Sequence, residues 1–166
     1  MSTLYSQPNV RRRSGKRERG FSLIELLIVI AIIMVIGTIA STSYSKAQMS
    51  SHETAVTQEM TTIYTAQIQY NGQYGKYAST LAELGPPTGG AEGPQGAGLI
   101  PKVLAEGSKN GYKFNMTGNG SSFALTAVPE VFGSTGRRTF FMDSSGKTIH
   151  QNFSAEPANA SSPELR

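Results

Sequence analysis

The chain has 166 residues, a formal net charge of +4 and a pI of about 9.4, which allows one membrane segment and one modest soluble domain. Residues 1–20 carry six Lys or Arg and one Glu, and the remainder carries nine Lys or Arg and ten Asp or Glu. Without residues 1–20 the chain is almost neutral, so the basic pI does not predict a nucleic acid partner. Cys is absent, which excludes disulfides.

The first predicted element is a polar and basic leader at residues 1–20. Residues 21–43 follow as an apolar segment in which Glu25 is the only charged residue. At about 1.5 Å per residue, a helix over residues 21–40 is about 30 Å long, which matches the bilayer core. The sequence therefore predicts a single-pass membrane helix, with the basic leader in the cytoplasm and the carboxy-terminal part outside it.

Glu25 is unusual because a carboxylate within a membrane segment is costly, roughly 2.5 to 3.5 kcal/mol at the centre of the span and less near its end. Two interpretations stay open on the residues alone. Glu25 is either a functional group, or an acid one helical turn from the membrane edge that reaches the headgroups and has no further role.

The segment Gly20-Phe21-Ser22-Leu23-Ile24-Glu25, placed between the basic leader and the apolar run, resembles the class III signal of type IV prepilins and type II secretion pseudopilins. The resemblance implies that a prepilin peptidase cuts between Gly20 and Phe21 and methylates the new amine of Phe21. It also implies that Glu25 aligns subunits during assembly. The family consists of structural subunits, so no enzyme activity is expected. The sequence offers few residues with catalytic or metal-binding chemistry, so no catalytic residue, cofactor or metal is predicted.

An ordinary or twin-arginine export signal, cut after Ala40, is the alternative interpretation, because Thr38-Ile39-Ala40 has the small residues of such a cleavage site. The apolar segment is longer than the usual 7 to 15 residues of a signal peptide, and Glu25 interrupts its start. Both features favour the prepilin interpretation.

Residues 44–75 are predicted to continue the helix as an amphipathic outer half. Apolar residues recur there at spacings of three and four, and this stripe should face a sheet. Its members are Met49, Val56, Met60, Ile63, Tyr70 and Tyr74. Gly37 precedes this half and is either a weak point of the helix or a site of close helix packing.

A globular domain is predicted at residues 76–153, with short helical turns at 79–84 and 101–106 and a loop over residues 85–111. Alternating apolar residues and the turns at 118–120 and 143–146 predict an antiparallel sheet over residues 112–153. Its strands are expected at 112–117, 122–128, 137–142 and 147–153. Residues 154–166 are expected to form a flexible tail. The predicted fold is α+β and pilin-like, with a long amino-terminal helix packed on a small antiparallel sheet.

The core is predicted to consist of aromatic and aliphatic side chains of the sheet, packed against three residues of the helix stripe. These residues are Phe114, Phe123, Leu125 and Phe140, against Val56, Met60 and Ile63. The tyrosines at the helix end are expected to pack the helix onto the domain.

Few residues have the chemistry of a catalytic or metal site. His52 and His150 are far apart in the chain, and Asp143 is the only aspartate. Because calcium usually takes six to eight oxygens, Asp143 is interpreted as a turn former, although major pseudopilins of the family hold calcium in a carboxy-terminal loop. Arg137-Arg138 with Lys113 and Lys147 is a candidate basic patch, interpreted as solvated surface charge.

The resemblance predicts the precursor of a structural subunit that polymerises through its amino-terminal helix into a type IV pilus-like filament. The alternatives are a major pseudopilin of a type II secretion system, or a minor pilin that binds surfaces or DNA. The expected partners are prepilin peptidase, further copies of the chain, other pilins or pseudopilins, the inner-membrane assembly machinery and membrane lipid. The expected location is the inner membrane, and then a surface pilus or a periplasmic pseudopilus.

Overall fold

The computed structural model describes residues 20–165, with the side chains of residues 39–42 excepted. Apart from Gly20, the predicted leader lies outside the described residues. The chain divides into two compact units, Met1–Ile39 and Ala40–Arg166.

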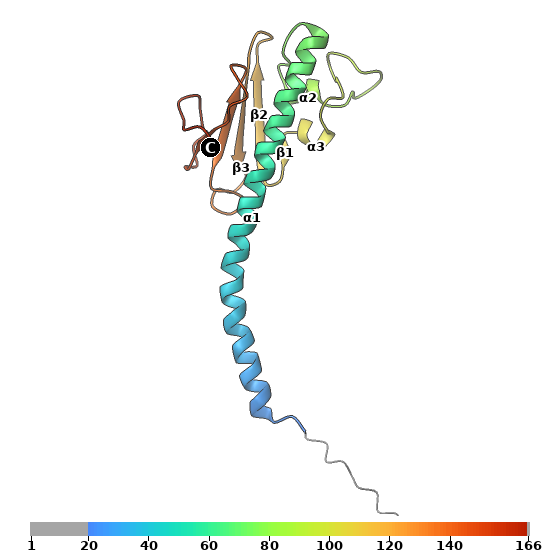
Figure 1. The fold of residues 1–166 in the computed structure, drawn as a ribbon. Helices are drawn as coiled ribbons and strands as arrows, with labels where there is room; N and C mark the ends of the chain where they lie inside the picture. The colour runs from blue at the N-terminus through green and yellow to red at the C-terminus, as the bar shows by residue number, and fades with distance from the viewer. Residues whose placement is uncertain (1–19, 166) are drawn as a thin grey trace, which may run out of the picture. The chain divides into compact units, whose positions relative to one another are not determined.

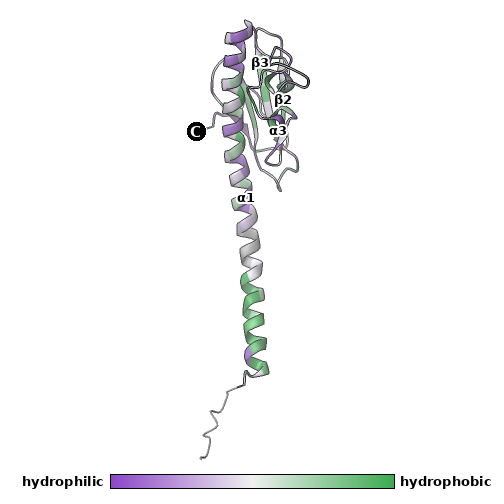
Figure 2. Ribbon diagram, turned by 90° about the vertical axis from the view of Figure 1, so that its right-hand side faces the viewer, coloured by the Kyte–Doolittle hydropathy of each residue, from purple (hydrophilic) through white to green (hydrophobic). Residues whose placement is uncertain are grey.

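Helix α1 (Leu23–Tyr74) has 52 residues and belongs to both units. Its first part has the green colour of apolar residues, apart from one hydrophilic position near its start (Figure 2). Within the described residues, α1 is the one helix that is long and apolar enough to span a membrane. The helix ends where Gly75 adopts a left-handed φ of 69°, and the Gly75 N–H donates to Asn71 O at 2.8 Å. Glycine takes this conformation without the steric cost that other residues have.

The second unit contains two short helices and an antiparallel sheet of five strands in the order β1-β2-β3-β4-β5 (Figure 1). Each strand pairs with its neighbour in sequence, so the sheet is a simple meander. The α+β fold with a long amino-terminal helix is confirmed. The elements after α1 are α2 (Leu81–Leu84), α3 (Lys102–Ala105), β1 (Ser108–Lys109), β2 (Tyr112–Gly118), β3 (Phe123–Pro129), β4 (Thr139–Asp143) and β5 (His150–Asn152).

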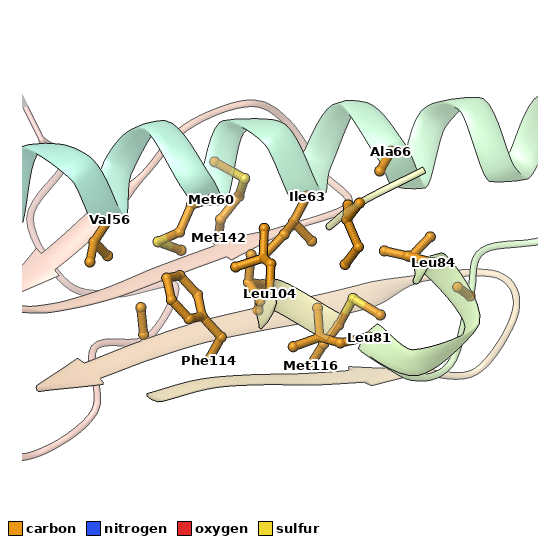
Figure 3. Packing of buried hydrophobic residues seen from close by; sticks show 14 of the residues in the cluster. Val56, Met60, Ile63, Ala66, Leu81, Leu84, Leu104, Phe114, Met116 and Met142 are labelled. Atoms are coloured by element: carbon orange, nitrogen blue, oxygen red, sulfur yellow. The ribbon is translucent and has the colours of Figure 1, made fainter. Parts of the chain in front are cut away.

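The core lies between one face of the sheet and the second-unit part of α1 (Figure 3). Side chains of β2 and β3 alternate between buried and more exposed, which is the two-residue period of a strand with one covered face. On α1 the buried positions Val56, Met60 and Ile63 follow the three-and-four spacing of a helix face. All seven residues predicted for the core are buried. Six of them belong to one cluster, whereas Phe123 lies outside it and packs against the rings of Tyr64 and Tyr77.

Gln67 is a buried polar residue of α1 that the apolar pattern did not predict. Its amide holds the segment after the helix, because Gln67 Oε1 accepts from Ala78 N at 2.9 Å and Gln67 Nε2 donates to Ala78 O at 3.0 Å. One side chain thereby satisfies both backbone groups of Ala78, which would otherwise be costly to bury.

Strand β5 (His150–Asn152) is shorter than the predicted 147–153, and β4 begins later than predicted for a specific reason. Arg137 and Arg138 were expected to begin a strand, but the Arg137 N–H donates to Glu53 of α1 and the Arg138 carbonyl accepts from the Tyr112 hydroxyl. These backbone groups are therefore not available to a ladder, and β4 begins at Thr139. Strand β1 was also missed, within the predicted loop.

Residues 154–165 differ from the flexible tail that the sequence predicts. Gln151 N donates to Pro163 O and Leu165 N donates to Ile149 O, both at 2.8 Å. Ala158 is buried. The segment has few apolar residues, but backbone pairing along the outer edge of β5 holds it without a large apolar surface.

Phe123→Ala is expected to lower the free energy of unfolding of the second unit by about 3 to 5 kcal/mol, because it leaves a cavity in a close-packed core. Phe123 is 3% exposed, and the rings of Tyr64 and Tyr77 lie 5.9 and 5.2 Å from its ring. The measurement is thermal unfolding of a fragment that begins at Ser45. Phe153→Ala is the control, since Phe153 is exposed and its loss should change stability by no more than about 0.5 kcal/mol. Equal melting of the two variants would contradict the core assignment.

Candidate functional site

The amino-terminal end of α1 contains the residues that the sequence singles out. Ser22 precedes the first helical residue, and Glu25 lies in the first turn. The Ser22 N–H donates to Glu25 Oε2 at 2.9 Å, and Leu26 N donates to Ser22 O at 3.3 Å. Glu25 therefore satisfies one of the amide groups that a helix start leaves without a partner, which is half of a capping box.

This hydrogen bond gives Glu25 a local role within the first unit. A carboxylate in the first turn also interacts favourably with the positive end of the helix dipole, by about 0.3 to 1 kcal/mol at an exposed site. The acid therefore stabilises the helix start beside Gly20 and Phe21, both of which are exposed. Whether it aligns subunits stays a prediction.

Residues 21–38 present their large apolar side chains to the outside. Phe21 is 86% exposed, and the apolar residues from Leu23 to Ile36 are each exposed. Six of them, Leu27, Ile28, Ala31, Ile32, Val35 and Ile36, line one apolar face of the helix. An apolar surface of this extent is typical of a segment that is covered by lipid or by other protein chains. A Cβ added at Gly37 would meet no atom within 4 Å, so packing within the chain does not require glycine there.

Asp143 forms the turn after β4, as the sequence predicts. Its Oδ1 accepts from Ser145 N at 2.9 Å and from the Ser145 hydroxyl at 2.5 Å, which is the local hydrogen bonding of an Asx turn. Within residues 20–165, no three His, Cys, Asp or Glu side chains are grouped closely enough to hold a metal ion.

The candidate basic patch is not one surface. Arg137 and Arg138 precede β4, whereas Lys147 follows the turn at the other end of that strand. Arg138 is also paired, since its guanidinium contacts the Glu53 carboxylate at 2.8 Å. Lys147 therefore does not join the candidate patch, and the interpretation as solvated surface charge does not hold for Arg138. The order of charges along the chain did not show which end of the strand each residue occupies.

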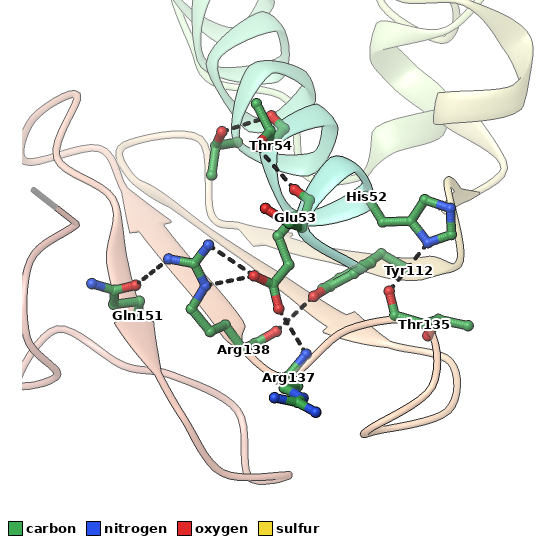
Figure 4. Close-up of polar contacts among 10 residues, drawn as sticks. His52, Glu53, Thr54, Tyr112, Thr135, Arg137, Arg138 and Gln151 are labelled. Carbon is green, nitrogen blue, oxygen red and sulfur yellow. Dashed lines mark hydrogen bonds and ion pairs between the residues drawn. The ribbon is translucent and has the colours of Figure 1, made fainter. Parts of the chain in front are cut away.

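Glu53 is a buried carboxylate of α1 whose contacts were not predicted from the sequence. Its side chain is 9% exposed and accepts from the Arg137 N–H at 2.7 Å and from Arg138 Nε at 2.8 Å (Figure 4). Arg138 continues to Gln151 Oε1 of β5 at 2.9 Å. This chain of charge-assisted hydrogen bonds ties the helix to β4 and β5.

Tyr112 completes the same cluster. Its hydroxyl donates to Arg138 O at 2.9 Å, and burial, followed by the nearby Glu53 carboxylate, raises the pKa of Tyr112 well above its ordinary value. The hydroxyl therefore stays protonated and remains a donor over the whole physiological pH range. Gly136 passes so close to the Tyr112 ring that a Cβ there would collide with it.

The tyrosines at the end of α1 pack the helix onto the domain, as predicted. Tyr70 is fully buried, its ring lies 4.6 Å from that of Tyr74, and its hydroxyl donates to Pro94 O at 2.8 Å. Burial, and then the neighbouring Glu83 carboxylate, raise the pKa of Tyr70. These contacts fix the glycine-rich loop beside the helix end.

Comparisons with known proteins agree with the amino-terminal motif. A family model described as the prokaryotic N-terminal methylation motif matches residues 15–41. The chain is also 36% identical over 73 residues to the type IV major pilin protein PilA of Myxococcus xanthus (strain DK1622), an alignment that covers 44% of this chain. The chain spans about a third (33%) of the length of this relative. No solved structure matches the chain.

Proposed function

The chain carries the amino-terminal methylation motif of type IV prepilins, and on this premise we propose that it is the precursor of a structural subunit of a type IV pilus-like filament. The observation that supports this most directly is the segment of residues 21–38 at the start of α1, whose large apolar side chains are exposed. Such a helix needs a bilayer before assembly and neighbouring helices afterwards. The type IV pilus, rather than a secretion pseudopilus, is favoured because the relative described above is a type IV major pilin.

Processing follows from the motif in this proposal. Prepilin peptidase cuts between Gly20 and Phe21 and the Phe21 amine is methylated. Both residues are exposed at the start of α1, so a membrane enzyme could reach the bond. The basic leader keeps its own side of the membrane cytoplasmic, and the sheet domain is then on the outer face of the inner membrane.

Assembly in this proposal depends on Glu25. Removal of residues 1–20 creates a cationic amine at Phe21, about one helical turn from the Glu25 carboxylate. This amine, from the same chain or from a neighbouring subunit, lowers the cost of placing the carboxylate among apolar helices.

The predicted mature protein begins with methylated Phe21 when the chain is expressed with a prepilin peptidase. The measurement is mass spectrometry of the intact protein and of its amino-terminal peptide. Replacing Gly20 by Arg should leave the precursor uncut, because the resemblance places the peptidase's glycine there. Gly37→Ala is the control for a glycine outside the cleavage site and should be cut normally. A mature terminus at Ser41 would instead show that residues 1–40 are an export signal.

A further inference from the structure

The second unit has a groove between the first turns of its part of α1 and the residues that flank strands β4 and β5. It has a volume of about 370 Å³ and is called the basic groove below. The residues that define it are Lys46, Met49 and Glu53 of α1, with Arg137, Arg138 and Phe153. Three cations against one carboxylate give this surface an excess of positive charge.

Two of these cations are available to a ligand. The Arg138 guanidinium is occupied by Glu53 and by Gln151. Among the described residues, neither Lys46 nor the Arg137 side chain lies within ion-pair distance of a carboxylate. Figure 4 shows the Arg137 guanidinium directed away from Glu53, to which only the backbone of Arg137 is bound.

The groove also presents apolar surface. Phe153 is 68% exposed, and Met49 lies at the base of the groove with 6% of its surface exposed. Outside the groove, Tyr44 precedes Lys46 by two residues on α1 and is 65% exposed. Aromatic rings and basic side chains beside one another are typical of protein surfaces at a membrane interface.

We infer that the basic groove binds the headgroups of anionic phospholipids, with Lys46 and Arg137 at the phosphate and Phe153 at the acyl boundary, while the subunit is held in the membrane before assembly. This inference rests on the proposed membrane segment, residues 21–43. Lys46 follows the end of that segment by three residues, which brings this part of the chain to the headgroup layer. A free anion would satisfy the cations but leave the exposed Phe153 ring in water.

The test uses the chain from Phe21 onward in lipid nanodiscs of phosphatidylcholine, with or without phosphatidylglycerol. Because the chain has no Cys, a fluorophore can be placed on one introduced cysteine at a time. Ala155→Cys reports on the groove, Ser121→Cys on the β2–β3 turn, and Ile30→Cys on the membrane segment. With phosphatidylglycerol present, a nitroxide on the lipid headgroup should quench the probe at 155 more strongly than the probe at 121.

Lys46→Gln with Arg137→Gln should lower the equilibrium constant for headgroup contact about 30-fold, which corresponds to about 1 kcal/mol for each cation near an anionic surface. The matched control is Lys113→Gln with Lys147→Gln, which removes the same charge from exposed positions outside the groove and should keep the quenching.

Three outcomes would overturn the inference. The first is equal quenching of the probes at 155 and 121, while a nitroxide on the acyl chain still quenches the probe at 30. This result would contradict lipid binding by the groove but leave the proposed membrane segment unaffected. Energy transfer between probes at 155 on two copies, lost in the Lys46 and Arg137 variant, would identify a second copy of the chain as the occupant. Absence of acyl-chain quenching at 30 would contradict the proposed membrane segment, and the lipid inference with it.

Discussion

Glu25→Gln is expected to be cut, methylated and inserted in the membrane like the unchanged chain, but to form no filaments. Insertion should be easier, because the substitution removes the only charge of residues 21–43. The glutamine oxygen can still accept the Ser22 N–H, so the helix cap that Glu25 forms at 2.9 Å is retained. What is lost is the carboxylate that would neutralise the amine of a neighbouring Phe21. The measurements are mass spectrometry for processing and electron microscopy for filaments.

Glu25→Ala separates the two roles of this residue further, since it removes the cap as well as the charge. If the charge aligns subunits, Glu25→Gln and Glu25→Ala should both fail to form filaments. Filaments of normal number from Glu25→Gln, with none from Glu25→Ala, would show that the cap matters and the charge does not. That result would contradict the role proposed for the carboxylate.

Glu53→Gln is expected to lower the free energy of unfolding of the second unit by about 3 kcal/mol. Removing one partner of a buried ion pair typically costs about 3 to 5 kcal/mol, and the low end applies because the Arg138 side chain is 25% exposed. Glutamine has one oxygen in place of two, so its NH₂ group would face either the Arg138 guanidinium or the Arg137 N–H, a donor against a donor in both cases. Thermal and urea unfolding of the fragment that begins at Ser45 would measure the loss.

Glu59→Gln is the matched control on the same helix. Glu59 is paired with Lys109 alone, and no backbone N–H donates to its side chain among the described residues. Its loss should cost about 1 kcal/mol. A double-mutant cycle of Glu53→Gln with Arg138→Gln should give a coupling energy well above that of Glu59→Gln with Lys109→Gln. Equal couplings would show that the contacts of Glu53 add nothing to those of an ordinary pair.

The elements with local periodicity were predictable from the sequence. The proline-free run of residues 23–74 and the alternation of Tyr112, Phe114 and Met116 need only neighbouring residues to be recognised. The amino-terminal motif is equally local, since Gly20, Phe21 and Glu25 fall within six residues. Packing then followed, because a stripe at helical spacing and a strand with one apolar face bury each other.

Contacts between distant residues could not be predicted in this way. Glu53 and Arg138 are 85 residues apart in the chain, and each by itself resembles an ordinary exposed charge. The hydrogen bonds of Gln67 could not be predicted either, because its partner is the backbone of Ala78. Every residue has these backbone groups, so they leave no pattern in the sequence. The end of the chain was misjudged since its attachment to β5 depends on main-chain pairing, which composition does not report.

The attachment of residues 163–165 along β5 bears on how copies of the domain behave when they are crowded. An open strand edge is a template for pairing with another chain, and proteins at high local concentration are at risk of joining sheet to sheet. Here one outer strand is covered by Pro163 and Leu165, and the strand at the opposite side, β1, is only two residues long. The edge at β5 therefore offers little for uncontrolled lateral aggregation, and assembly through that edge would need contacts other than strand addition.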